Sequence, residues 1–319
     1  EFPAGSTEHF SKATKCCAYI PYVPNFLAGR ELESGSDTVS STSVLTRLKQ
    51  GRDVHPLGLL PSPVFTALYS IGSDVFGRTE TLRCPHFVEK DGGCGIWRNR
   101  NSICSTWFCK HVRGHISRKF WTELRDLLRL AEDELAIWSA MELGIDSATL
   151  ADILARRATG SLSEVLTGTS IDGKADPAHQ RMVWGKWYTQ EAEFFLSCAK
   201  LVSQLRWNDV LSIAGPSLRA RISLVREALS AVQSTHLSAR LKLGNFRIHG
   251  VKDGKASLVS YSAFDPFVVP AVLLNLLPLF DGRPSAEVLN LIDQEYDIVI
   301  EESLLRKLVD FQILVPVQD

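Results

Sequence analysis

The sequence predicts a mainly helical α+β protein, and two features carry that prediction. Apolar residues recur every three or four positions over long stretches after residue 116, whereas cysteine concentrates in the first third. Hydrophobic residues make up 45% of the chain and charged residues 22%, which is a globular composition. Because 319 residues exceed one ordinary core, we expect three consecutive domains, over 1–115, 116–238 and 239–319.

The first domain, over 1–115, is expected to consist of loops with short regular pieces. Proline breaks a helix because its ring clashes with the preceding turn, and prolines stand at Pro21, Pro24, Pro56, Pro61 and Pro63. Gly35 to Ser43 is rich in Ser and Thr and indicates a loop. Residues 62–76 carry apolar side chains at spacings that a single helix would place on one face.

The second domain, over 116–238, is expected to be helical. The apolar spacing predicts helices over 117–143, 147–157, 178–206, 208–214 and 217–232. Gly144 ends the first of these, and Gly215-Pro216 breaks the fourth. Residues 160–177 form a polar connection. The acidic run Glu132-Asp133-Glu134 is interpreted as a solvated face of the first helix, with basic neighbours as surface partners.

The third domain, over 239–319, changes pattern again. Two strands are predicted over 240–251 and 255–261, joined around Asp253-Gly254, which is a strong hairpin signal. An apolar helix should follow Asp265-Pro266 and stop at Asp281-Gly282, and Ser285 should cap the next helix. A third helix over 301–311 and a strand over 313–317 complete the layout. A hairpin with three helices predicts a small winged-helix-like domain.

Six of the seven cysteines lie in the first domain. Cys16 and Cys17 are adjacent, and Cys84, Cys94, Cys104 and Cys109 follow with nine, nine and four residues between them. Thiolates collected from separate loops hold soft metals or iron–sulfur clusters. Disulfides and inert buried thiols are the alternatives, but disulfide-stapled proteins spread cysteines throughout the chain. Cys198 lies on a helix between leucines and is expected to be a core thiol.

The residues around these cysteines suit a ligand site. Gly92-Gly93 and Gly95 allow tight turns around Cys94, and nearby basic groups such as Arg100 would lower thiol pKa values. Candidate auxiliary ligands are His86, His111 and His115, the last two spaced to share a helical face; surface or capping histidines are the alternative. One tetrahedral zinc or one cubane cluster takes four ligands, so six cysteines leave two in surplus.

Residues 15–115 resemble the YkgJ-type cysteine-cluster family, which includes flagellin lysine N-methylases. The resemblance is carried by the Cys16-Cys17 pair and by Cys84-Pro-His-Phe, Cys94-Gly-Ile-Trp-Arg-Asn-Arg and Cys104-Ser-Thr-Trp-Phe-Cys109. Trp97, Asn101 and Ser105 depart from the family's usual Tyr, Pro and Arg, and a further cysteine upstream of the pair is missing. The resemblance implies an iron–sulfur cluster, of the 4Fe–4S type, with zinc as the alternative. It also implies S-adenosylmethionine, by way of the methylases.

Residues 240–319 are similar to PqqD-type peptide-recognition domains. The similarity is carried by Phe264-Asp-Pro-Phe, by Phe280-Asp-Gly-Arg-Pro-Ser-Ala-Glu-Val and by Leu304-Leu-Arg-Lys-Leu-Val-Asp-Phe. Those domains bind leader peptides at an exposed strand edge beside a helix, which implies a peptide or protein partner here. The alternative is an ordinary structural domain packed on the helical middle.

Composition excludes several other classes. A formal net charge of −1 provides no electrostatic case for nucleic acid or for an anionic membrane surface. No run of about 18 apolar residues predicts a membrane-spanning helix. A basic segment followed by an apolar one, as in a signal peptide, is not visible, so we expect a cytoplasmic protein. Phosphate-loop, nucleophile-elbow and dinucleotide fingerprints are missing as well.

Three functions remain open from the sequence. The first is an iron–sulfur or metal protein that acts in the modification of a peptide or protein, by methyl transfer or by redox chemistry. The second is a non-catalytic carrier of a metal or cluster, or a maturation factor. The third is a structural zinc protein that serves as an interaction module.

Overall fold

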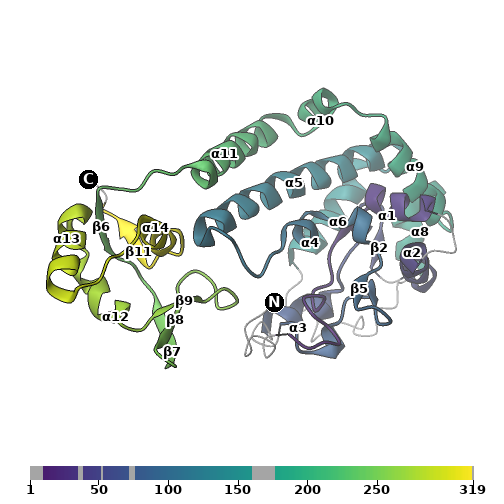
Figure 1. Cartoon of the computed structure of the whole chain (residues 1–319). Coiled ribbons are helices and arrows are strands. Elements are labelled where there is room, and N and C mark those ends of the chain that lie inside the picture. The colour runs from purple at the N-terminus through teal and green to yellow at the C-terminus, as the bar shows by residue number, and fades with distance from the viewer. Residues whose placement is uncertain (1–9, 35–38, 52, 72–75, 160–176, 318–319) are drawn as a thin grey trace. The chain divides into compact units, whose positions relative to one another are not determined.

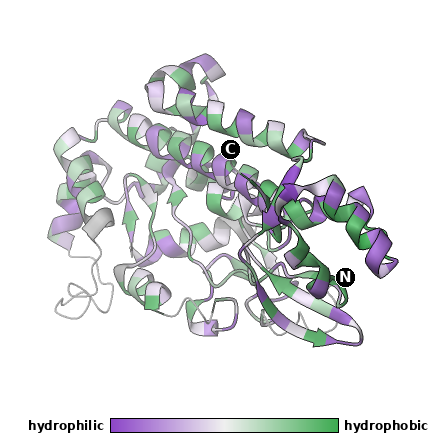
Figure 2. Ribbon diagram, turned by 90° about the vertical axis from the view of Figure 1, so that its left-hand side faces the viewer, coloured by the Kyte–Doolittle hydropathy of each residue, from purple (hydrophilic) through white to green (hydrophobic). Residues whose placement is uncertain are grey.

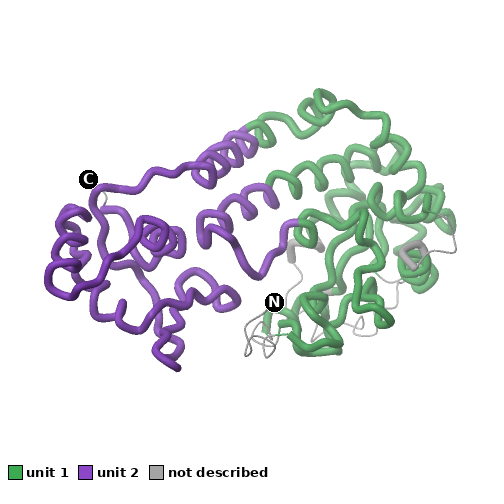
Figure 3. The backbone as a smooth tube through the Cα atoms, viewed as in Figure 1, with its two compact units in different colours: residues 1–105, 127–219 green, residues 106–126, 220–319 purple. Residues whose placement is uncertain are grey.

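The computed structural model describes the chain except for residues 1–9, 35–38, 52, 72–75, 160–176 and 318–319. The chain divides into two compact units, each built from two segments (Figure 3). Unit 1 comprises 1–105 and 127–219, and unit 2 comprises 106–126 and 220–319. This division differs from three consecutive domains. The protein is mainly helical with small sheets, which confirms the α+β class (Figure 1).

Unit 1 is built chiefly of helices. Its helices are α1 (Asn25–Glu33), α2 (Val39–Gln50), α3 (Pro63–Ile71), α4 (Ser102–Thr106), the second half of α5 (Gly114–Glu142), α6 (Ser147–Thr159), α8 (Pro177–Trp184), α9 (Glu191–Ser203), α10 (Trp207–Ile213) and the start of α11 (Gly215–Gln233). Short 3-10 turns lie at Glu80–Leu82, Trp97–Asn99 and Gly185–Trp187.

The strands of unit 1 are only two residues long. An antiparallel sheet runs in the order β1 (Val23–Pro24), β3 (Gly58–Leu59) and β2 (Val54–His55). A separate antiparallel hairpin joins β4 (Phe87–Val88) to β5 (Gly93–Cys94), with Phe87 opposite Cys94. The loops of the first 105 residues are therefore held by short pairings and by the helices around them.

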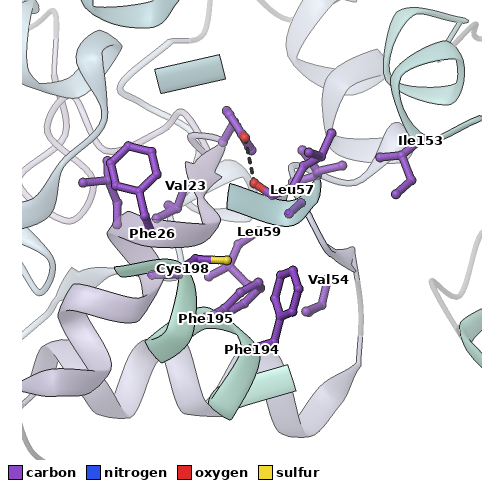
Figure 4. Packing of buried hydrophobic residues seen from close by; sticks show 14 of the residues in the cluster. Val23, Phe26, Val54, Leu57, Leu59, Ile153, Phe194, Phe195 and Cys198 are labelled. Atoms are coloured by element: carbon purple, nitrogen blue, oxygen red, sulfur yellow. Dashed lines mark hydrogen bonds between the residues drawn. The ribbon is translucent and has the colours of Figure 1, made fainter. Parts of the chain in front are cut away.

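The core of unit 1 forms where α1 packs against α9. Phe194, Phe195 and Cys198 of α9 are fully buried and belong to the same hydrophobic core as Val23 and Phe26 (Figure 4). Gly29 allows the two helix backbones to approach closely, because a Cβ there would lie 2.0 Å from the Phe195 carbonyl oxygen. Cys198 is thus a core thiol, which confirms that prediction.

A buried polar residue ties α1 to its neighbours in the same unit. The side-chain amide of Asn25 is fully buried, and its Nδ2 donates to the carbonyls of Pro56 and Ala136, both at 2.9 Å. Its Oδ1 accepts from the backbone N–H of Phe26 at 2.7 Å. Both polar ends of the amide are satisfied, so the burial does not leave an orphaned group.

One long helix predicted for unit 1 is wrong. The stretch 178–206 is divided into α8, a 3-10 turn and α9 because Gly185 and Thr189 have positive φ values of 52° and 69°. The helices that begin at Gly114, Ser147, Trp207 and Gly215 confirm the other periodicities. The predicted helix over 62–76 is observed as α3, with 72–75 outside the described residues, as is most of the predicted connection over 160–177.

Besides the first half of α5 and most of α11, the described part of unit 2 contains two three-stranded antiparallel sheets and three shorter helices. One sheet has the order β10 (Asp281–Pro284), β6 (Arg240–Leu243), β11 (Leu314–Pro316), and the other β7 (Arg247–Lys252), β8 (Lys255–Val259), β9 (Phe267–Pro270). The shorter helices are α12 (Leu273–Leu276), which continues as a 3-10 turn, α13 (Ser285–Tyr296) and α14 (Glu302–Asp310). Their apolar faces meet in a core centred on Leu258, Phe280 and Leu308.

The hairpin predicted at Asp253-Gly254 is confirmed. Both residues have positive φ, 50° and 70°, which a type I′ turn requires, and Lys252 pairs with Lys255 across it. The preceding strand, however, is split into β6 and β7, which belong to different sheets.

Two details of the third predicted domain are wrong. Residues 267–270 form β9 rather than the start of an apolar helix, because they pair with β8 and place Val269 in the core. Ser285 does not cap α13: it is the first helical residue, and its buried Oγ has no hydrogen-bond partner. An apolar run without clear periodicity fits either a helix or a buried strand, and here the neighbouring strand decides.

The segment 106–126 is held firmly within unit 2. Arg113 forms a bidentate ion pair with the carboxylate of Asp310, with nitrogen–oxygen distances of 2.9 and 2.7 Å. The same guanidinium donates from Nη1 to the carbonyls of Val232 and Ser234, at the end of α11. One arginine therefore joins three parts of the unit.

The long helices are amphipathic. Figure 2 shows that hydrophobic and hydrophilic residues alternate along the helices. In the described ranges of the chain, no helix is both long enough and apolar enough to span a lipid bilayer.

We predict that Gly29→Ala destabilises the protein, because the added methyl group would collide with the Phe195 carbonyl. Overpacking of this kind costs about 1–3 kcal/mol, and backbone atoms cannot move aside as a side chain can. Chemical denaturation should report the loss as a lower free energy of unfolding. Gly250→Ala is the matched control, since a Cβ there meets no atom within 4 Å. Equal stability of the two variants would contradict the close contact.

Candidate functional site

Five cysteines of unit 1 gather in one place. A thiolate at Cys16 raises the pKa values of Cys84, Cys94 and Cys104, and charges at Cys84 and Cys94 raise that of Cys17. Effects of this kind require the sulfur atoms to lie within a short range of one another. The sequence separates these residues by up to 88 positions, so folding creates the group, which we call the thiol cluster.

Backbone hydrogen bonds bring the segments of the thiol cluster together. The N–H of Cys84 donates to the carbonyl of Cys17 at 2.7 Å, which fixes the cysteine pair beside the second segment. The hairpin of β4 and β5 places Cys94 next, and the N–H of Gly95 donates to the carbonyl of His86 at 2.7 Å. These bonds set the positions of the sulfur-bearing residues without help from disulfides, because every cysteine is a thiol.

Helix α4 presents Cys104. The N–H of Cys104 donates to the side-chain oxygen of the buried Asn101 at 3.0 Å, which caps the helix. Glu132 on α5 accepts two bonds from Ser102, from its N–H and from its hydroxyl, both at 2.7 Å. Burial raises the pKa of Glu132 to about 7, although the bonds from Ser102 oppose that rise. The prediction that Glu132 lies on a solvated face is therefore wrong.

Basic side chains surround the thiol cluster. Burial raises the pKa values of Cys84, Cys94 and Cys104, and the positive charges of Arg47 (at Cys84) and Arg100 (at Cys94 and Cys104) partly oppose that rise; the Cys17 hydrogen bond lowers the pKa of Cys16, and Arg100 adds to this. The positive charge of Lys15 also contributes to the lowered pKa of Cys16. The guanidinium of Arg100 lies over the ring of Trp97, 3.6 Å from its centroid, an aromatic contact that holds the arginine in place.

The five thiols differ in acidity because they differ in burial and bonding. The hydrogen bond from Cys17 lowers the pKa of Cys16 to about 6 and raises that of Cys17. Burial raises the pKa values of Cys84 and Cys104 to about 12, and it raises that of Cys94 as well. Cys16 is exposed to solvent. Without a bound cation, it is the thiolate of the group at neutral pH.

Three buried polar atoms beside the thiol cluster have no hydrogen-bond partner among the described residues: Arg47 Nη1, His86 Nε2 and Arg100 Nε. Buried donors normally find an acceptor, so these atoms leave room for an anionic group. An iron–sulfur cluster is held by cysteine thiolates and is negatively charged. The five thiols and the positive charges around them therefore have the chemistry that such a cluster needs. Among the described residues, no three His, Cys, Asp or Glu side chains are arranged to hold a single metal ion.

Three of the candidate ligands belong to unit 2. Cys109 precedes α5 in that unit, and the N–H of His111 donates to Asp265 at 2.9 Å. The rings of His111 and His115 both lie against Tyr261, at centroid distances of 6.2 and 6.0 Å. The site described here is built from residues of unit 1 alone, namely the five cysteines and His86.

The sequence did not indicate several residues that shape the site. Arg47 and Ser43 lie on α2, about 40 residues before Cys84, and Glu132 lies on α5, 28 residues after Cys104. Their spacing from the cysteines follows no local motif. The one usable signal was on α2, where Ser43 and Arg47 are four residues apart and share a helical face.

We predict that Cys16 is alkylated by iodoacetamide far faster than Cys84 or Cys104 at pH 7 in metal-free protein, since the thiolate is the nucleophile. Its rate should rise with pH through a midpoint near 6. Mass spectrometry of each peptide measures the rates. Cys17→Ala removes the bonded thiol and should move the midpoint upward; an unchanged midpoint would contradict the bond between the two thiols.

We predict that Glu132→Gln flattens the pH dependence of stability. Burial raises the folded-state pKa of Glu132 from an ordinary 4.5 to about 7, so the folded protein holds a proton that the unfolded chain releases. Its contribution to the free energy of unfolding is therefore greatest at low pH and is lost as pH rises from about 4.5 through 7. Denaturation between pH 4.5 and 8 measures this slope. Glu134→Gln, on the same helix, is the control, and identical slopes in both variants would refute the assignment.

Comparisons with known proteins were made for the whole chain. No protein-family model matches it, and neither the curated proteins nor the solved structures contain a match.

Proposed function

We propose that unit 1 binds an iron–sulfur cluster through four of the five sulfurs of Cys16, Cys17, Cys84, Cys94 and Cys104. The observation that carries the proposal is the thiol cluster itself, formed from three separate segments and bordered by Arg47 and Arg100. A 4Fe–4S cluster takes four thiolates and adds negative charge, which basic neighbours stabilise. When bound, such a cluster supplies one-electron transfer.

Zinc is the alternative occupant. A structural zinc site is a closed tetrahedron with zinc–sulfur distances of about 2.3 Å, and the described residues contain no group arranged for a single ion. A 4Fe–4S cluster instead takes four thiolates around a larger cage of irons and sulfides. A zinc site would make the protein a structural interaction module.

The chain's own residues support a role in modifying a peptide or protein. Cys16 is exposed while Cys84 is buried, so one edge of the thiol cluster faces solvent and the other faces the unit's interior. A partner can approach the exposed edge, and the buried edge excludes water. A polypeptide that reaches the exposed edge could undergo redox chemistry or methyl transfer there. The alternative is a protein that carries the cluster without catalysing a reaction.

Unit 2 offers a second candidate function, as a winged-helix-like, PqqD-like site for an extended peptide. Strand β7 is an edge of its sheet, and all its residues are exposed, including Ile248 and Val251 at 53% and 57%. An exposed edge can pair with a further strand. Because Arg247, Lys252 and Lys255 add positive charge, the occupant we propose is an acidic, extended peptide segment.

A register shift gives β7 an apolar stripe. Ile248 pairs with Leu258 and Val251 pairs with Ala256, with an irregularity between Ile248 and Gly250. Leu258 and Ala256 are two residues apart and point to one face of β8. Their partners on β7 therefore also share a face, which an added peptide could cover.

We predict that protein purified without oxygen is brown and contains about four irons and four sulfides per chain, as a cubane cluster requires. The Cys104→Ala variant should contain much less iron and sulfide than the wild type, because one ligand of the cluster is removed. Cys198→Ala is the control, since that thiol lies in the core. Colourless wild-type protein with one zinc per chain would refute the cluster and favour the structural alternative.

We predict that Val251→Asp weakens the binding of acidic peptides to the full-length protein by at least tenfold, because the new charge repels the peptide and removes apolar contact. Fluorescence polarisation with a labelled acidic peptide library measures the affinity. Val299→Asp places the same change at another exposed site of unit 2 and should leave binding intact. Equal binding by both variants would remove β7 from the proposed site.

A further inference from the structure

Two side chains at the buried edge of the thiol cluster are anchored at one end and unpaired at the other. Arg47 is 8% exposed; its Nη2 donates to the carbonyl of Leu60 at 2.6 Å, whereas Nη1 has no partner. His86 is 1% exposed; its Nδ1 lies 2.9 Å from the Ser43 hydroxyl, whereas Nε2 has no partner. Both anchors fix where the unpaired nitrogens lie.

Helix α2 holds both groups in place. Ser43 and Arg47 are one turn apart, so they share a face of the helix. Ser43 reaches His86, and the charge of Arg47 acts both on His86 and on Cys84. The backbone N–H of His86 also donates to Cys84 Sγ at 3.4 Å. All three groups therefore lie on the Cys84 side of the thiol cluster.

A neutral imidazole carries one ring hydrogen, on Nδ1 or on Nε2. When the Ser43 hydroxyl donates to Nδ1, the hydrogen lies on Nε2. Arg47 Nη1 and His86 Nε2 are then both donors, and two donors cannot bond to each other. Two buried donors without an acceptor lose free energy unless an anion is bound between them.

We propose that Arg47 Nη1 and His86 Nε2 donate hydrogen bonds to sulfur atoms of the bound cluster near Cys84 and thereby raise its reduction potential. This inference rests on the proposed function, because it needs the cluster in place. Donors and positive charge near cluster sulfurs stabilise the more negative, reduced state, which makes the potential more positive. Both are positioning residues: their effect passes through the sulfur atoms.

The test is the midpoint potential of the anaerobically purified, full-length protein, measured by redox titration in an optical cell. Arg47→Gln and His86→Gln should each shift the potential to more negative values. Arg47→Lys, which keeps the charge, should retain most of the wild-type potential. Lys49→Gln is the matched control, because it removes one positive charge from an exposed position of the same helix and should leave the potential unchanged.

The outcomes separate this inference from the proposed function. Wild-type protein without iron and sulfide would overturn both. Wild-type protein with a cluster, whose potential is the same in folded Arg47→Gln and His86→Gln, would overturn this inference alone. Strong nitrogen hyperfine coupling in the reduced protein that disappears in His86→Gln would make His86 a ligand and would also overturn it. If Arg47→Gln does not fold, as judged by circular dichroism, His86→Gln and Arg47→Lys decide the question.

Discussion

Crowding of negative charge is the constraint on which the site depends. Burial raises the pKa values of Cys84 and Cys104, and negative charge on neighbouring thiolates, such as Cys16 and Cys94, raises that of Cys84 further. The protein opposes this cost with Arg100 on the exposed side and Arg47 on the buried side. Without a bound metal, Cys16 is the one thiol of the five that ionises readily, because the hydrogen bond from Cys17 lowers its pKa. A bound cation or cluster would allow the remaining thiols to ionise together.

A rigid framework holds these charges together. The close approach of α1 and α9 at Gly29 forms the core on which the loops of the first 105 residues rest. The bonds from Ser102 to Glu132 fasten α4, and therefore Cys104, to α5. The thiol at Cys198 belongs to that core, so cysteines serve two purposes in unit 1: one packs, and the others gather around a site.

Unit 2 has its own core and its own attachments. Arg113 joins the segment 106–126 to Asp310 and to the end of α11, so this part of the chain folds with residues that follow it by more than a hundred positions. Its exposed edge strand β7 and the thiol cluster of unit 1 are different kinds of binding feature, one for a polypeptide backbone and one for thiolate chemistry.

The sequence by itself determined the local features: the long helices of period 3.6, the turn at Asp253-Gly254, and the concentration of six cysteines between residues 16 and 109. Only the tertiary structure decided that residues 267–270 form a strand, since pairing with β8 outweighs local preference. It also decided that Glu132 is half-buried and bonded to Ser102, that Arg47 and Ser43 reach the site, and that Cys109 belongs to unit 2. The physical reason is common to all of these: burial and charge depend on residues distant in the sequence, and no local pattern records them.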